Sequence, residues 1–202
     1  MNKALIVVDM QNDFGHPAGA LYVNGADKVI PAVGEVIHNV QHCLPPPQGT
    51  KDLIIFTKDR HPVKTSHFDN WPPHCVADTW GYDLVGDLHH LTFGSQTFIK
   101  GLGDKDDYSG FDGVHLIPGQ VPGDDNFGLA TYLSYHNVHS VTVCGLALDY
   151  CVKATALDAV KHGFLTHVIL NATAAVNLNE GDAKKAIDEL EAAGVHTHGE
   201  LN

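Results

Sequence analysis

Residues 140–162 read SVTVCGLALDYCVKATALDAVKH and pass from a strand pattern into a helix pattern. Ser140–Cys144 is rich in β-branched residues, as is typical of a buried strand, and a helix is expected from Asp149 to His162. Gly145 and the small residues near it favour a tight turn between the two. A strand that leads directly into a helix is the repeating unit of α/β proteins with a parallel sheet.

The same alternation of strand and helix recurs on both sides of this unit. Strands are expected at Lys3–Val8, Asp52–Thr57, Gln96–Ile99, His167–Leu170 and Val195–Thr197. Helices are expected at Asp27–Leu44, Asp124–Tyr135 and Gly181–Ala193. Strands that alternate with helices predict βαβ units, whose crossover helices cover both faces of a parallel sheet. The predicted fold is therefore α/β, with three α/β/α layers and a mostly parallel, doubly wound sheet.

Chain length and charge limit the possible partners. A chain of 202 residues fits one domain, expected to span residues 1–202. The formal net charge is −12, so we expect a small-molecule substrate and neither a nucleic-acid partner nor a membrane partner. The apolar run Ala4–Val8 is too short to span a bilayer and lacks the flanks of a secretory signal. A cytoplasmic protein is expected.

Cys151 is a candidate nucleophile. It lies where the helix is expected to begin, and free backbone N–H groups at a helix N-terminus stabilise a thiolate and can hold an oxyanion. A free cysteine is also often just a small buried hydrophobe, and position alone leaves both readings open. Cys144, inside the strand, is assigned to the core. Without a secretion signal, all four cysteines are expected to stay reduced.

Two charged residues follow other predicted strands. Asp9 comes directly after Val8, and Lys100 comes directly after Ile99. Ligands of doubly wound sheets bind beyond the carboxyl ends of the strands, so both side chains are candidates for the site of Cys151. Asp9 would act as the proton acceptor and Lys100 as a cation. Taken singly, Asp9 is more commonly interpreted as a residue that caps the following turn, and Lys100 as a solvated surface residue.

A histidine-rich loop follows the second strand. Asp59 and His61 stand two residues apart in an extended segment, so their side chains point to the same side, and His67 and His74 come after them. One aspartate with two or three histidines suits Zn(II), Fe(II) or Mn(II). The intervals match no compact zinc motif, so a solvated histidine-rich loop stays open as the alternative.

Several segments together resemble the nicotinamidase/pyrazinamidase branch of the isochorismatase-like cysteine hydrolases. The matching pieces are LIVVDMQNDF (5–14), TKDRHP (57–62), SHF (66–68), WPPHCV (71–76), FIKG (98–101), YSGF (108–111) and VCGLALDYCVKATALDA (143–159). They occur in order over nearly the whole chain. Each piece alone is weak, but the set is highly specific.

The resemblance implies roles for individual residues. Asp9, Lys100 and Cys151 would form a catalytic triad that hydrolyses nicotinamide to nicotinate and ammonia through a Cys151 thioester. A cis peptide between Leu146 and Ala147 would orient the N–H groups of Ala147 and Cys151 as the oxyanion hole. This activity would belong to NAD salvage.

The resemblance also implies a metal site and a substrate pocket. One divalent ion, zinc first and iron or manganese as alternatives, would be held by Asp59, His61 and His74, with His67 as a candidate fourth ligand. The pyridine ring of nicotinamide would be held by Phe14, Leu21, Trp71, Tyr108 and Leu146. Tyr150 stands where some relatives have histidine, which makes ring selectivity less secure than the chemistry.

Three other readings compete with this one. Isochorismatases share the fold but lack the nucleophilic cysteine and the metal loop. Other cysteine amidases of the superfamily act on carbamoyl or ureido groups, and they generally lack the complete metal set. A non-enzymatic interaction module would require the triad and the metal loop to be vestigial together. A homo-oligomer is compatible with every reading.

Overall fold

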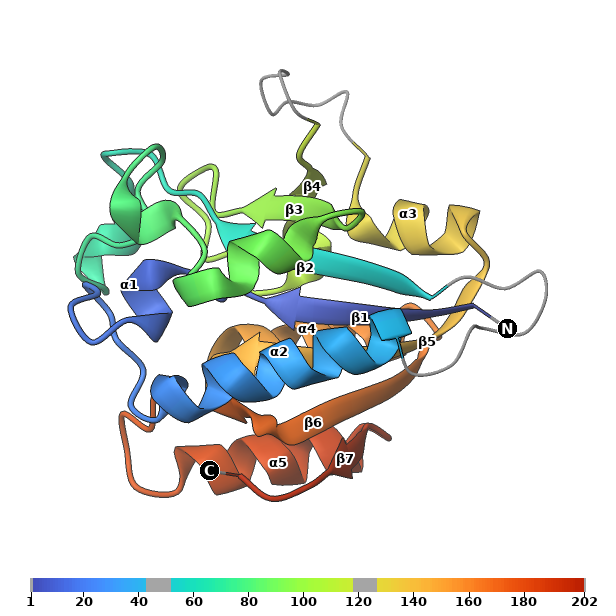
Figure 1. Cartoon of the computed structure of the whole chain (residues 1–202). Helices are drawn as coiled ribbons and strands as arrows, with labels where there is room; N and C mark the ends of the chain where they lie inside the picture. Colours follow the sequence, from blue (N-terminus) through green and yellow to red (C-terminus); the bar gives the residue numbers. More distant parts are fainter. Residues whose placement is uncertain (1, 43–51, 118–126, 202) are drawn as a thin grey trace.

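The computed structural model describes residues 2–42, 52–117 and 127–201, which form a seven-stranded sheet (Figure 1). Its strands, in spatial order, are β4 (Val114–His115), β3 (Gln96–Lys100), β2 (Leu53–Asp59), β1 (Asn2–Val8), β5 (Val138–Leu146), β6 (Leu165–Ala174) and β7 (His196–His198). Neighbouring strands are parallel except for β3 and β4, which pair antiparallel. The sheet is thus mostly parallel, as predicted.

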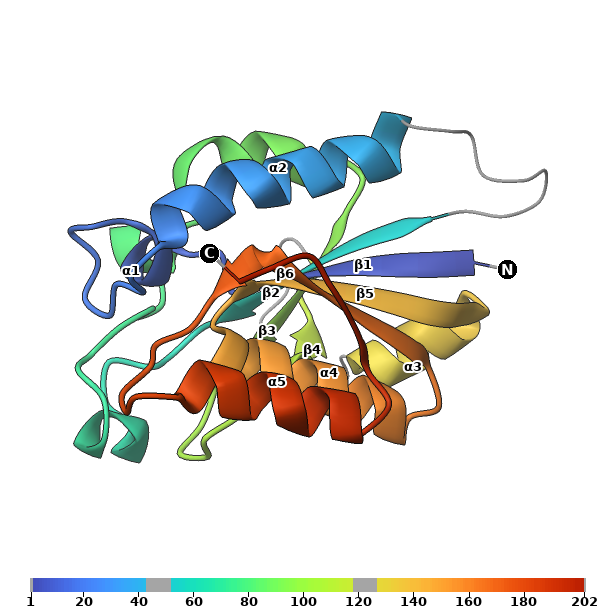
Figure 2. The same cartoon turned by 90° about the horizontal axis from the view of Figure 1, so that it is seen from below.

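Helices cover both faces of this sheet. The helix α2 (Ala26–His42) packs on one face, and α3 (Leu129–Tyr135), α4 (Lys153–Lys161) and α5 (Asp182–Ala192) pack on the other (Figure 2). This arrangement confirms the predicted three-layer α/β architecture. Among the described residues, the helices all fall short of the length and apolarity needed to cross a membrane.

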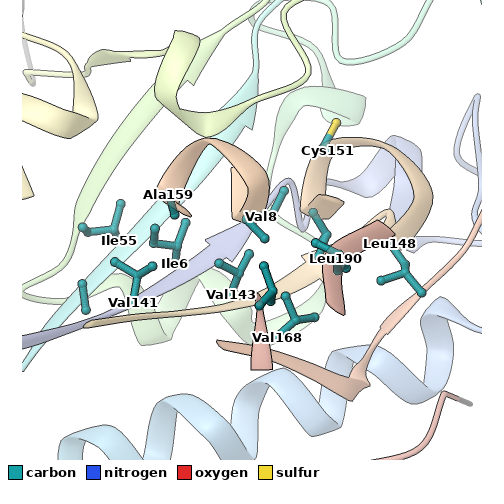
Figure 3. Packing of buried hydrophobic residues seen from close by; sticks show 14 of the residues in the cluster. Ile6, Val8, Ile55, Val141, Val143, Leu148, Cys151, Ala159, Val168 and Leu190 are labelled. Carbon is teal, nitrogen blue, oxygen red and sulfur yellow. The ribbon is translucent and has the colours of Figure 1, made fainter. Parts of the chain in front are cut away.

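The two faces of the sheet bury separate hydrophobic clusters. Ile6 and Val8 of β1 pack with Val143 of β5 on the face of α4 and α5, where Figure 3 shows the cluster at close range. Each fully buried aliphatic side chain of this kind contributes about 1.5–3 kcal/mol to folding. Cys151 lies at the margin of the same cluster, with its sulfur pointing away from the labelled aliphatic side chains. The core thus supports the backbone of Cys151 while its thiol stays turned toward the site.

The direction of the chain through the sheet reverses beside β1. From β1 the chain moves through β2, β3 and β4 to one edge, and it returns to pair β5 with the other side of β1. Open sheets bind ligands at such switch points. The strands approach closely here, because a Cβ on Gly145 would lie 2.2 Å from the carbonyl oxygen of Val8, and Gly145 has a φ of 108°. Glycine is therefore required at this position.

Some predicted boundaries were wrong. The helix expected from Asp124 begins at Leu129, because Gly128 is extended and forms a bridge with Val114, while residues 124–126 lie outside the described ranges. The helix expected from Asp149 begins with a π-helical turn, η5 (Leu148–Val152), before α4. The expected strand His167–Leu170 continues to Ala174.

Short elements in the long loops were not predicted at all. They are α1 (Asn12–Gly15) and the 3₁₀ helices η1 (Ser66–Asp69), η2 (Trp80–Tyr82), η3 (Gly86–Thr92) and η4 (Gly110–Asp112). Short 3₁₀ turns carry little periodicity in the sequence, so only the tertiary context fixes them.

Candidate active site

Three residues from different segments of the chain meet at the switch point. Lys100, the last residue of β3, places its Nζ 2.9 Å from Oδ2 of Asp9 and 3.5 Å from Sγ of Cys151. All three side chains are buried. Asp9 follows β1 with a φ of 46°, a left-handed conformation that costs free energy in a non-glycine residue and is concentrated at functional sites. The structure therefore brings together the three residues predicted to be catalytic.

Asp9 is held by a second strand as well. The Thr57 hydroxyl donates a 2.7 Å hydrogen bond to Oδ1 of Asp9, while Oδ2 faces Lys100. Burial raises the pKa of Asp9, and the Lys100 ammonium offsets this only in part. Burial also opposes the charge of Lys100, but Asp59 and Asp9 together keep the pKa of Lys100 well above its usual range. Lys100 is thus a cation, and Asp9 has a higher proton affinity than a solvated aspartate.

The Cys151 thiol is neutral at rest, whereas its position in the sequence favoured a stabilised thiolate. Burial raises the pKa of its thiol well above the usual range, and the nearby Lys100 offsets this only in part. Cys151 also lies in the π-helical turn η5, rather than in the first turn of an α-helix. A neutral thiol at rest requires a neighbouring base, and Asp9 is placed to supply one.

The turn around Cys151 is tied to the loop after β6. Both carboxylate oxygens of Asp149 accept backbone hydrogen bonds at 2.9 Å, one from Val176 and one from Asn177. The peptide bond between Leu146 and Ala147 is cis, as the resemblance implies. π-Helical turns are rare and occur mostly at functional sites.

Three histidines from the long loop form a buried cluster. One ring nitrogen each of His61, His67 and His74 lies within 4.8 Å of the others. Both ring nitrogens of His61 are buried and lack a hydrogen-bond partner among the described residues. Burial lowers the pKa of His74 to about 4, so its imidazole is neutral at pH 7. Neutral imidazoles with unsatisfied nitrogens are the donors that a divalent transition ion requires.

Hydrogen bonds orient the rings of this cluster. Nδ1 of His74 lies 2.7 Å from the carbonyl oxygen of Pro72, and Nδ1 of His67 lies 2.5 Å from a carboxylate oxygen of Asp106. Such bonds fix one nitrogen and leave Nε2 for a ligand, as in many metal sites. His61 pairs with the segment of His74 through a hydrogen bond from its backbone N–H to the carbonyl of Cys75, at 3.0 Å.

Asp59 lies between the cysteine and the histidine cluster. Its Oδ1 forms an ion pair with Lys100, and its Oδ2 lies 3.8 Å from Nε2 of His61. Burial opposes ionisation, but Lys100 and His61 together outweigh it and hold the pKa of Asp59 below its usual value. Gln11 fixes the backbone of Asp59 with two bonds, donating to its carbonyl at 2.8 Å and accepting from its N–H at 2.7 Å.

One cavity joins these groups. Its lining combines the predicted pocket residues with the cysteine and the histidines: Phe14, Leu21, Val23, Asp59, His61, His67, Trp71, His74, Asp107, Tyr108, Leu146, Ala147, Tyr150, Cys151 and Val176. The five residues predicted to hold the substrate ring are all in this lining, and their role in binding stays a prediction. The wall is mainly apolar and aromatic with a few polar groups, as is usual for small-molecule sites.

Sequence reasoning missed several residues that support the site. Thr57, Gln11 and Asp106 hold Asp9, Asp59 and His67 by hydrogen bonds, and Asp107 and Val176 line the cavity. Thr57 and Gln11 fall inside motifs already singled out, so a polar residue two positions from a candidate was the available signal. Asp106 carried none, because its partner is 39 residues away.

The chain matches one known protein family over nearly its whole length. The model of the isochorismatase domain matches residues 3–199, nearly the whole length. The chain belongs to the isochorismatase family.

Several similar proteins are named as nicotinamidases or pyrazinamidases, which are amidases. A Mycobacterium tuberculosis protein named nicotinamidase/pyrazinamidase is 33% identical over 196 residues, which is 96% of each chain. The pyrazinamidase of Pyrococcus horikoshii in complex with zinc superposes with a TM-score of 0.79 at 36% identity, covering 97% of this chain and 98% of that one. L. infantum PnC1 in complex with nicotinate also reaches 0.79, at 31% identity over 98% and 92% of the two chains.

Proposed function

We propose that this isochorismatase-family chain is a metal-dependent cysteine amidase that hydrolyses nicotinamide to nicotinate and ammonia. The observation that carries the proposal is the position of Lys100, whose Nζ lies 3.5 Å from Sγ of Cys151 and 2.9 Å from Asp9. Cys151 lines one aromatic cavity together with the three histidines of the cluster. Relatives and structural neighbours named nicotinamidase or pyrazinamidase support the choice of substrate.

Asp9 and Cys151 perform the first half of the reaction. Asp9 takes the thiol proton as the sulfur attacks the carboxamide carbon, which gives a tetrahedral intermediate. The backbone N–H groups of Ala147 and Cys151 hold its oxyanion. Asp9 returns the proton to the amide nitrogen, the C–N bond breaks, and ammonia leaves a thioester on Cys151.

The second half repeats this proton transfer with water. Asp9 takes a proton from a water molecule as its oxygen attacks the thioester carbon. The C–S bond then breaks, nicotinate is released, and the sulfur regains a proton from Asp9. Lys100 remains a cation throughout and stabilises the negative charge as it moves between sulfur and carboxylate.

Asp59, His61 and His74 would hold the divalent ion, with His67 as a fourth donor. The unsatisfied ring nitrogens of buried His61 and the three-histidine geometry fit such an ion. When bound, the metal supplies a Lewis-acid contact for the pyridine nitrogen of the substrate. We propose zinc, because imidazole nitrogens suit it and a similar structure is described as a complex with zinc.

The aromatic wall would select a flat ring. Trp71 donates a 3.1 Å hydrogen bond from Nε1 to the Tyr108 hydroxyl, and its ring meets that of Tyr150 edge to face at 5.3 Å. Phe14 lies on the His74 side of the cavity, with ring centroids 5.3 Å apart. A planar pyridine placed between these rings would present its carboxamide to Cys151 and its nitrogen to the histidines.

The decisive experiment compares ammonia release from nicotinamide with release from carbamoyl and ureido substrates, before and after chelation. Hydrolysis of nicotinamide that is lost on chelation and restored by zinc is expected. Turnover of the carbamoyl or ureido compounds alone would instead assign the chain to another branch of cysteine amidases. We propose a role in NAD salvage in the cytoplasm, and this role depends on the hydrolysis of nicotinamide.

A further inference from the structure

Three histidines form a second cluster away from the cavity, on the last two strands of the sheet. His167 lies on β6, and His196 and His198 lie on β7; we call them the β7 histidine cluster. His167 is in the first half of β6, whereas the cavity residue Val176 comes after its carboxyl end. The cluster therefore belongs to a different part of the sheet from the candidate active site (Figure 1).

Strand pairing places the three imidazoles on one face. His167 is directly paired with His196, and His198 is two residues further along the same strand. The residue between them, Thr197, points to the opposite face, where its hydroxyl donates a 2.6 Å hydrogen bond to Glu191 of α5. Because side chains alternate along a strand, His196 and His198 share the face opposite to that of Thr197 and α5.

The ring nitrogens approach as closely as two ligands of one ion. Nδ1 of His167 lies 2.9 Å from Nε2 of His198. Two nitrogens bound about 2.0–2.1 Å from a tetrahedral zinc are separated by roughly 3.3 Å, so a small side-chain adjustment would admit the ion. The ring of His196 stacks beside that of His167, with centroids 5.2 Å apart.

The turn after the cluster lies close to β6. Gly199 has a φ of 78°, and a Cβ there would lie 2.7 Å from Oδ1 of Asn171 on β6. His198 and His196 are exposed, while His167 is half-buried between its neighbours. The cluster thus lies on two paired strands and is accessible from solvent.

We propose that His167 and His198 form a surface site for a divalent transition ion such as Zn(II), Ni(II) or Cu(II). Imidazole ligands suit these ions, whereas Mg(II) and Ca(II) prefer oxygen. The site is separate from the ion assigned to Asp59, and it does not depend on the proposed amidase activity.

Calorimetric titration with Zn(II) tests this site in the full chain. Wild type is expected to bind one zinc equivalent more than His198→Ala or His167→Gln, and His162→Ala is the matched control. His162 is an exposed histidine at the end of α4, on the other face of the sheet. All three variants should keep wild-type ammonia release from nicotinamide. Equal zinc stoichiometry and affinity in wild type and His198→Ala would overturn the proposal, and so would an equal loss in His162→Ala.

Discussion

Asp59 and Lys100 form a buried ion pair that connects the cysteine to the histidine cluster. One carboxylate oxygen of Asp59 contacts the ammonium, and the other faces His61. Lys100 in turn contacts Asp9 and Cys151. A change in the metal site would therefore reach the nucleophile through one shared carboxylate.

Asp59→Asn should impair both metal binding and catalysis. The amide removes the negative charge that pairs with Lys100 and the anionic donor for the ion, so metal affinity and ammonia release should each fall about 100-fold or more. Metal analysis and a turnover assay would measure this. Asp69→Asn, at an exposed aspartate of the same loop, is the control and should behave like wild type. Wild-type activity with full metal content in Asp59→Asn would refute the shared role.

Thr57→Val should slow turnover with little effect on substrate affinity. The change is nearly isosteric, but it removes the hydroxyl bond that orients Asp9. A hydrogen bond to a charged group contributes about 1.5–3 kcal/mol, so kcat should fall at least about tenfold while KM stays within about twofold.

Thr166→Val provides the matched control for Thr57. Its hydroxyl is equally buried and donates to the carbonyl of Phe164 at 3.0 Å, away from the cavity. Both variants should remain folded, as a denaturant titration would show. Equal kcat in the two variants would show that Thr57 has only a structural role.

Trp71→Phe should weaken nicotinamide binding. Phenylalanine keeps an aromatic wall but loses the hydrogen bond to Tyr108, so KM should rise about three- to tenfold with kcat largely retained. Steady-state kinetics with Trp80→Phe as the control would test this, since Trp80 is half exposed and lies outside the cavity lining. An unchanged KM in Trp71→Phe would remove Trp71 from the binding wall.

The rate of Cys151 alkylation should rise continuously with pH in protein from which a chelator has removed the metal. Burial raises the pKa of the thiol, so the reactive thiolate fraction grows about tenfold per pH unit until pH reaches that pKa. Iodoacetamide labelling between pH 6 and 9, read by peptide mass spectrometry, should show no plateau. Cys144, fully buried in β5, should remain unlabelled. A plateau below pH 7 would indicate a resting thiolate instead.

The sheet was predictable because its strands are nearly continuous apolar runs. β1 and β5 are buried on both faces, and such runs between helical patterns have few other solutions. The site residues Asp9 and Lys100 were predictable for the same reason, since each directly follows a buried run. Cys75, Cys144 and Cys151, the cysteines in the described ranges, form no disulfide with one another.

The details that tune the site were not predictable, because they depend on long-range contacts. Gln11 forms two hydrogen bonds with the backbone of Asp59, 48 residues away, and no local sequence pattern predicts these bonds. The thiol pKa of Cys151 depends on burial, which outweighs the effect of Lys100. Position in the sequence indicates where a side chain lies, but its charge state is set by everything packed around it.

The most direct test of the proposed chemistry is rapid-quench mass spectrometry with nicotinamide, together with ammonia release by Cys151→Ala. Wild type should carry a nicotinoyl adduct on the peptide that contains Cys151, formed as ammonia is released and lost as nicotinate appears. Cys151→Ala should form no adduct and release no ammonia above background, while still binding the ligand. Substantial turnover by a folded Cys151→Ala protein would contradict the covalent mechanism.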